Sequence, residues 1–306
     1  MNKTFFIFIA SLLFLMALFS GGIELSLQEQ LSFSLISVVL LGIPHGAIDN
    51  VIFLRQHEVS AKSFYIFYLI AIGLNALLWL YAPMLSIVAF LLISAYHFGQ
   101  SQFSHYKLLK RTTVVLSFAW GASILSAMLL FNLGELKELT TTVQGFQSFR
   151  LSLNSQAFLS MFLLFSLITL ICLSINLYKR KFTLEQFLFE ILVLALVIFS
   201  FYVFPLIIGF TLYFTVLHSL KVLQEEYRFV EKLYDKSLSL MAFGKLLFPY
   251  TTISVFGMGI IYLLSELNIL PTLSFGYLLL ILISSITLPH AFVMDRFYKK
   301  KQQPIS

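Results

Sequence analysis

The stretch from Leu31 to Leu54, LSFSLISVVLLGIPHGAIDNVIFL, is long and apolar enough to cross a membrane, yet it contains His45 and Asp49. A helix of about 20 predominantly apolar residues spans the hydrocarbon core of a bilayer. Ionisable side chains are costly inside such a segment, and they usually face the interior of a helix bundle or a cavity. This stretch therefore predicts a membrane-spanning helix that carries part of a functional site.

The composition of the whole chain indicates an integral membrane protein. Of its 306 residues, 59% are hydrophobic and 11% are charged, whereas about 25% are charged in a typical soluble domain. Cutting the apolar runs at charged residues and prolines predicts an all-α, polytopic bundle that forms one membrane domain over residues 1–306. The ten predicted spans are residues 4–20, 31–54, 63–82, 83–103, 111–133, 155–178, 184–204, 205–223, 246–264 and 273–297.

The distribution of positive charge predicts how the bundle is oriented. With these spans, 18 of the 20 lysine and arginine residues lie on the side of the N-terminus, and Lys137 and Arg150 lie on the other side. Loops rich in lysine and arginine remain in the cytoplasm, so we expect both termini to be cytoplasmic. The net charge of +6 then reflects membrane orientation and gives no support to nucleic-acid binding.

Two further features bound the possible chemistry. Residues 224–245 combine charged side chains with apolar residues at helical spacing, which predicts either an amphipathic helix on the cytoplasmic surface or a solvated linker. The single cysteine, Cys172, lies in an apolar run. One cysteine excludes an internal disulfide and most thiolate metal sites.

Four histidines lie inside the predicted spans, namely His45, His97, His218 and His290. Their spans all run in the same direction, and each histidine precedes the cytoplasmic end of its span by five to nine residues. At 1.5 Å of rise per residue, this places them at a common depth of roughly 8 to 14 Å. A single histidine at this depth is commonly a hydrogen-bonding residue between helices, but four at one depth predict a metal site.

The surroundings of the histidines suggest which metals they suit. Neutral imidazole binds iron, zinc and copper, whereas calcium and magnesium require oxygen ligands. Asp49, one turn after His45, and Glu190 in the seventh span are candidates to accept the outer N–H of a ligating histidine. Pro44 and Pro289 directly precede histidines and predict helix bends that either aim ligands or only adjust packing.

These motifs resemble those of the Brp/Blh family of bacterial membrane proteins, which are β-carotene 15,15′-dioxygenases that cleave β-carotene with O2 into two retinals for microbial rhodopsins. The resemblance rests on four motifs: Gly42-Ile43-Pro44-His45-Gly46-Ala47-Ile48-Asp49, His97-Phe98-Gly99, His218-Ser219 and Pro289-His290.

The resemblance implies a non-haem Fe(2+) ion with His45, His97 and His218 as ligands, and it places the protein in the inner (plasma) membrane. The family tends to have another histidine one turn after the His-Ser histidine, where this chain has Val222. The family also tends to have acids after His-Phe-Gly, where this chain has Gln100-Ser101-Gln102. His290 then either completes the ligand set, or the chain is a relative with altered activity.

The expected partners are a carotenoid, O2 and membrane lipid, with a microbial rhodopsin as a possible recipient of retinal. Tyr96, Phe98 and Tyr213 are candidates for the wall of a carotenoid site, since they are close in sequence to the histidines, although ordinary helix packing is the simpler explanation of each. Two other functions stay open: a carotenoid or retinal carrier without turnover, and a haem-binding electron-transfer protein. Fatty acyl desaturases need clustered histidine boxes that this sequence lacks.

Overall fold

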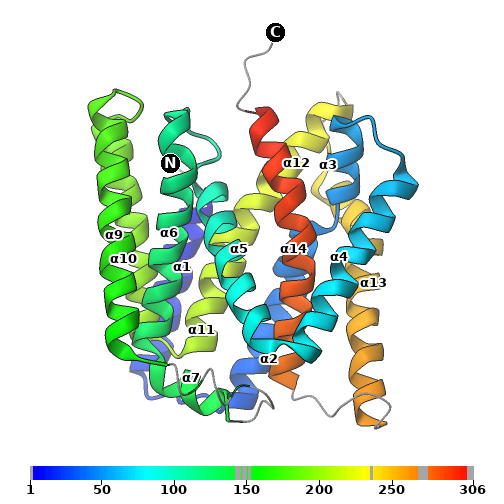
Figure 1. Ribbon diagram of the computed structural model, residues 1–306, viewed down its shortest axis with the longest axis horizontal. Coiled ribbons are helices and arrows are strands. Elements are labelled where there is room, and N and C mark those ends of the chain that lie inside the picture. Colours follow the sequence, from blue (N-terminus) through cyan, green and yellow to red (C-terminus); the bar gives the residue numbers. More distant parts are fainter. Residues whose placement is uncertain are drawn as a thin grey trace.

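The computed structural model describes residues 3–141, 146, 150, 153–234, 237–267 and 275–301. Most of these residues are helical and none forms a strand, and ten helical segments are long and apolar enough to cross a membrane. The prediction of an all-α bundle with ten spans is therefore confirmed. In Figure 1 the N-terminus and the C-terminus both lie toward the upper end of the bundle.

Most spans end close to the predicted positions, because charged residues and prolines interrupt the apolar runs there, but the eighth span continues to Tyr234 and the ninth already begins at Leu240. In chain order the described α-helices are α1 (Lys3–Ser20), α2 (Leu27–Ser37), α3 (Asp49–Gln56), α4 (Ala61–Tyr81), α5 (Pro83–Phe103), α6 (Lys110–Phe131), α7 (Leu133–Leu139), α9 (Ser155–Tyr178), α10 (Leu184–Val203), α11 (Leu206–Thr211), α12 (Leu220–Tyr234), α13 (Leu240–Glu266) and α14 (Phe275–Lys301).

Two of the spans change their helical type in the middle. The second span passes from α2 through a π-helical turn, η1 (Val38–Gly42), and a 3-10 turn, η2 (Ile43–Gly46), before α3 begins. Pro44 lacks an N–H group and cannot continue the α-helical hydrogen bonds. The eighth span passes from α11 into a longer π-helix, η3 (Leu212–Ser219), and then into α12. Such π-helical insertions are frequent at functional sites.

The two prolines that precede histidines therefore have different effects. Pro44 lies in the 3-10 turn that follows the π-helical turn, and His45 lies in the same 3-10 turn. At Pro289 helix α14 continues as an α-helix from Phe275 to Lys301.

Helices α5 and α6 pack backbone against backbone at two glycines. A Cβ atom placed on Gly99 of α5 would lie 1.8 Å from the carbonyl oxygen of Ser117 in α6. Conversely, a Cβ atom on Gly121 of α6 would lie 1.9 Å from the carbonyl oxygen of Ala95 in α5. Small residues at a helix interface permit this close approach in membranes. The glycine of the His-Phe-Gly motif thus fixes the position of the helix that carries His97.

The helices that carry the four histidines occupy the centre of the bundle. Figure 1 shows α9 and α10 at one edge and α13 at the opposite edge, with α5, α2 and α14 between them. Most side chains of α13 are exposed, including Phe248, Ile253 and Phe256, each 69% exposed. This exposure is what a helix that faces lipid requires, because lipid tails solvate apolar side chains.

The segment expected as a surface helix or a linker is helical as far as Tyr234. Helix α12 continues the eighth span without a break and buries Val222, Glu226 and Val230. Residues 235 and 236 lie outside the described part of the chain, and α13 begins at Leu240. The first half of this segment consequently packs into the bundle, where Glu226 enters the polar interior described below.

Candidate metal centre

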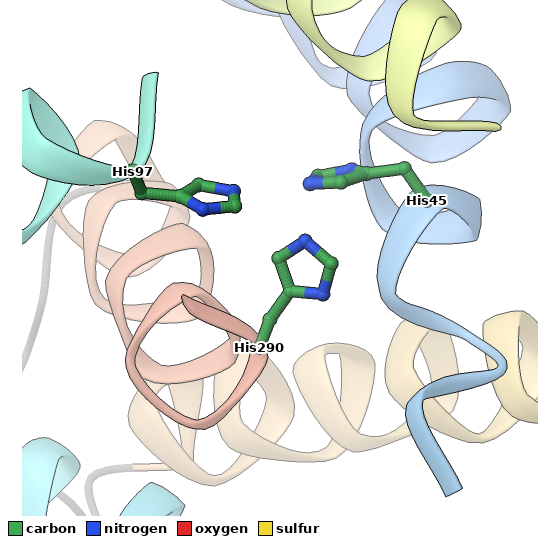
Figure 2. A group of neighbouring side chains, drawn as sticks. All are labelled: His45, His97 and His290. Atoms are coloured by element: carbon green, nitrogen blue, oxygen red, sulfur yellow. The ribbon is translucent and has the colours of Figure 1, made fainter. Parts of the chain in front are cut away.

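The structure brings the four histidines from four different spans together. Around the cluster, the ring centroids of His45 and His290 are 4.6 Å apart, those of His290 and His97 5.0 Å, those of His97 and His218 5.0 Å, and those of His218 and His45 5.4 Å. Figure 2 shows the rings of His45, His97 and His290 turned toward a common point. One nitrogen from each of these three rings lies within 4.8 Å of the other two.

Local backbone structure aims two of these rings. His45 lies in the 3-10 turn η2 and His218 lies in the π-helix η3. Gly46, which follows His45, lets the second span approach α14 closely. A Cβ atom on Gly46 would lie 3.3 Å from Nδ1 of His290, so a larger residue would press on the ring. The Pro-His-Gly motif therefore combines a change of helical type, a ligand and a close approach.

Hydrogen bonds at Nδ1 determine the tautomers of three histidines. Nδ1 of His45 contacts the carbonyl oxygen of Gly42, and Nδ1 of His290 lies 2.9 Å from Oδ1 of Asp49. A carbonyl and a carboxylate only accept hydrogen bonds. These two histidines therefore carry their proton on Nδ1 and leave the lone pair of Nε2 free.

The third tautomer follows from the hydrogen bonds of Ser101. Its hydroxyl group donates to the carbonyl oxygen of Phe98 at 2.9 Å, and its Oγ lies 3.0 Å from Nδ1 of His218. A hydroxyl group has a single hydrogen to donate, so Ser101 accepts the hydrogen bond from His218. Nε2 of His218 is consequently the nitrogen with a free lone pair.

Four of the eight ring nitrogen atoms of this cluster are buried without a hydrogen-bond partner. All four side chains are at most 6% exposed. Within the described part of the chain, Nε2 of His218, Nε2 of His290 and both ring nitrogens of His97 have no partner. Buried polar atoms are nearly always hydrogen-bonded in native proteins. Unpartnered imidazole nitrogens that face one another fit a transition-metal ion, for which neutral imidazole is a preferred ligand.

Asp49 contacts a histidine of the cluster, as the sequence suggested without indicating which one. It accepts a hydrogen bond from His290, across the bundle, and not from His45 one turn earlier. Its other oxygen, Oδ2, accepts a hydrogen bond from the hydroxyl group of Tyr68 at 2.8 Å. The 3-10 turn and the residues that follow it rotate Asp49 away from His45, and His45 uses the carbonyl oxygen of Gly42 instead.

Glu190 lies in a neighbouring polar network and does not bond to a histidine. Its carboxylate accepts hydrogen bonds from Nε2 of Gln102 and from the hydroxyl group of Tyr106, both at 2.8 Å. Lys221 reaches the same network by donating to the backbone carbonyl of Gln102 at 2.7 Å. Burial and the nearby Glu190 carboxylate raise the pKa of Tyr106 well above its usual value, so its hydroxyl group remains a donor.

Val222 contributes no metal-binding atom and packs in an apolar cluster. Its side chain is fully buried with Ile48, Val293 and Met294. The cluster of rings nevertheless has four members, because His290 enters it from α14. The four spans that carry the motifs of the resemblance therefore supply the imidazoles.

A large apolar cavity leads from the opposite half of the bundle toward the histidines. Its volume is about 240 Å³, and aliphatic and aromatic side chains of α2, α5, α6, α7, α11 and α14 line it almost entirely. Ser94 and Phe98, which flank His97 on α5, lie in its wall. A smaller cavity of about 20 Å³ touches His45 and His290, and Ile283 lines both cavities.

The three aromatic residues that we expected in the wall have different environments. Phe98 lines the large cavity, and its ring lies 4.7 Å from that of His218. Tyr213 is fully buried against Phe98, with ring centroids 5.3 Å apart, and is not among the lining residues. Tyr96 is also not a lining residue, because its hydroxyl group donates to Asp295. Of the three expected residues, Phe98 alone lines this cavity.

Sequence reasoning missed two residues of the polar interior. Ser101 follows His97 by one helical turn and sets the tautomer of His218, and its spacing was a signal that it shared a face with the site. Glu226 was assigned to a surface segment, yet it is fully buried near Asp49 and His290. Glu226 lies one turn after Val222 on the span that carries His218, and this position could have indicated that it faces the site.

Comparison with known proteins adds one finding. A family model described as beta-carotene 15,15'-dioxygenase matches residues 36–298 of the chain. This range includes all four histidines, Asp49 and Glu226. Neither the curated proteins nor the solved structures gave a significant match.

Proposed function

The chain belongs to the β-carotene 15,15′-dioxygenase family, and on this basis we propose that it is a multi-pass membrane enzyme that cleaves β-carotene with O2. The proposed cleavage is at the central 15,15′ double bond and gives two molecules of retinal. The observation that carries this proposal is the convergence of four buried imidazoles beside an apolar cavity, whose wall includes Phe98, the neighbour of His97.

The cofactor in this proposal is a ferrous ion held by His45, His97, His218 and His290. The free lone pairs at Nε2 of His45, His218 and His290 support this role, as does the lack of any hydrogen-bond partner for either nitrogen of His97. When bound, ferrous iron supplies the capacity to bind and activate O2. Asp49 and Ser101 hold the rings of His290 and His218 in the tautomer that presents Nε2.

The apolar cavity is the proposed site for one end of the substrate. β-Carotene is a hydrocarbon without polar groups, and the cavity wall offers almost no hydrogen-bonding atoms. The bilayer is the reservoir for such a molecule, so the substrate enters laterally between helices. Burial in the apolar wall excludes water from the reacting double bond and fixes its position relative to the histidines.

A series of aromatic rings connects the cavity with the histidine cluster. Phe210 lines the cavity and stacks on Phe214, with ring centroids 5.5 Å apart and planes inclined by 7°. Phe214 in turn stacks on His218 at 5.8 Å, and Phe98 lies against both rings. Flat apolar rings of this kind can guide a conjugated chain and restrict its rotation.

Expression in a β-carotene-producing bacterial host tests the proposed function. We expect the carotene absorption to fall and retinal to accumulate, with microbial rhodopsin as the proposed recipient of retinal. The His97→Ala variant, expressed to the same level, should leave the pigment unchanged. If the native chain is well expressed and contains iron but the pigment is unchanged, the result would favour a carotenoid carrier. A Soret band in the absorption spectrum of the protein would indicate bound haem.

A further inference from the structure

A second group of potential metal ligands lies beside the histidine cluster. Asp49 of α3, Glu226 of α12 and His290 of α14 each place one potential ligand atom within 4.8 Å of those of the other two. Their side chains are 2%, 0% and 1% exposed, respectively. Three helices that are distant in sequence thus bring two carboxylates and one imidazole together in the interior.

The carboxylate of Glu226 has no partner that would compensate its charge. Within the described residues, neither of its two oxygen atoms accepts a hydrogen bond. Asp49 is better satisfied, since its oxygens accept hydrogen bonds from His290 and Tyr68. An isolated buried carboxylate is strongly disfavoured unless a proton, a cation or hydrogen-bond donors compensate it. The Glu226 side chain therefore points to a missing positive charge.

The basic residues nearby bind other groups. Nζ of Lys221 donates to Gln102, and Nζ of Lys301 lies 3.6 Å from Oε1 of Glu225. In the described part of the chain, no lysine or arginine forms an ion pair with Asp49 or Glu226. The adjacent Glu225 adds further negative charge, although Ser104 donates a hydrogen bond to it at 2.6 Å. The protein itself thus leaves these carboxylates without a cation.

We propose that Asp49, Glu226 and His290 form a binding site for a second divalent metal ion next to the histidine cluster. The mixed set of carboxylate and imidazole ligands suits a first-row transition-metal ion such as iron or manganese. It suits calcium and magnesium less well, because these ions prefer oxygen ligands alone.

His290 lies between the two sites and can serve both. In Figure 2 one nitrogen of its ring faces His45 and His97, whereas Nδ1 lies against Asp49. A second ion held by Asp49 and Glu226 would take the place of the Nδ1 proton, which would pass to solvent, while Nε2 would remain directed toward the histidine cluster. The second site does not depend on carotene cleavage, and it exists whatever the substrate of the protein is.

Metal stoichiometry of the full-length protein in detergent tests this proposal. The purified apoprotein is equilibrated with ferrous ion under anaerobic conditions, freed of unbound ion, and measured by mass spectrometry of the metal. We expect two equivalents in the native chain and one equivalent in Glu226→Gln, which preserves the shape of the side chain. Glu225→Gln, with the same change one residue away, should retain two equivalents.

The native chain alone already gives a decisive result, even if a variant fails to fold. If the native chain and Glu226→Gln each bound one equivalent of ferrous ion, the proposal would be overturned. A proton would then neutralise the Glu226 carboxylate in place of a metal ion. The His97→Ala variant separates the two sites, since it should lose the ion of the histidine cluster and retain the ion at Glu226. Loss of metal in Glu226→Gln but not in His97→Ala would support the second site and contradict the proposed iron site.

Discussion

Asp49 Oδ1 and His290 Nδ1 lie 2.9 Å apart, although 241 positions separate the two residues in the chain. This contact joins the second span to the last one at the depth of the histidine cluster. Because the carboxylate accepts the Nδ1 proton, it directs the lone pair of Nε2 toward the other imidazoles. The proposed metal site thus depends on the carboxylate of Asp49. This residue belongs to the same sequence motif as His45, but it forms its hydrogen bond with His290.

Replacement of Asp49 by asparagine should weaken metal binding. The amide can still accept one hydrogen bond from His290 but lacks the charge that makes the imidazole a stronger ligand. Loss of such a supporting carboxylate typically costs about 10- to 100-fold in metal affinity, and we expect this loss for the first equivalent of ferrous ion, measured by anaerobic titration. Asp295→Asn is the control, because its amide oxygen can still accept from Tyr96 and Gln100. Equal affinity of Asp49→Asn and the native chain would contradict this role.

Replacement of Ser101 by alanine should also weaken metal binding, but less. His218 then loses the acceptor for its Nδ1 proton, and the ring can adopt either tautomer or rotate. A neutral hydrogen bond contributes about 0.5 to 1.5 kcal/mol, so we expect a drop in ferrous ion affinity of roughly 2- to 13-fold. Ser104→Ala is the matched control on the same segment, since the hydroxyl group of Ser104 bonds to Glu225 and to the backbone carbonyl of Ser101. A greater loss in the control than in Ser101→Ala would disprove the assignment.

Replacement of Gly99 by alanine should destabilise the bundle. The added methyl group would overlap the carbonyl oxygen of Ser117, which belongs to the backbone and cannot rotate away. Overpacking in a core costs about 1 to 3 kcal/mol, and we expect a cost at the upper end of that range as a lower thermal midpoint in detergent. Gly73→Ala in α4 should leave the midpoint unchanged or raise it, because nothing lies within 4 Å of its Cβ position. A Gly99→Ala midpoint equal to that of the native chain would contradict the close packing of α5 and α6.

Replacement of Leu129 by tryptophan should block substrate binding and spare the metal. Leu129 lines the large cavity from α6, and the larger side chain would occupy much of its volume of about 240 Å³. We expect retinal formation to fall at least about tenfold, equivalent to about 1.4 kcal/mol, while iron content stays at the native level. The control is Leu164→Trp on α9, where the native side chain is 53% exposed. Normal turnover in Leu129→Trp would show that the substrate uses another route.

Much of the fold was predictable because the membrane simplifies the problem. Spans must be apolar and long, so the ends of segments such as Pro83–Phe103 and Ser155–Tyr178 follow directly from the sequence. The common depth of the histidines followed from the same reasoning. Rotation about each helix axis is set by packing against neighbours, and it decides which side chains meet. For this reason the sequence placed His45 and His290 in one layer and marked Asp49 as a partner of a histidine, but it could not show that this histidine is His290.

Other differences between the expectations and the structure have the same physical origin. Tyr213 and Phe98 are both close in sequence to histidines, but Phe98 alone faces the cavity. The π-helix η3 and the turns η1 and η2 shift the faces of two spans, and no regular helical period predicts that shift. Glu226 looked like a surface residue because its neighbours in sequence are charged. Its burial depends on α12 continuing into the bundle beside α3 and α14.

The purified protein, loaded with iron and incubated with β-carotene and O2 in detergent, provides the most direct test of the central claim. Chromatography of the products should show two molecules of retinal for each β-carotene consumed, and the His97→Ala and His290→Ala variants should form none. Products of unequal length would contradict central cleavage. Undiminished retinal formation by the two histidine variants would contradict the assignment of the reaction to the histidine cluster.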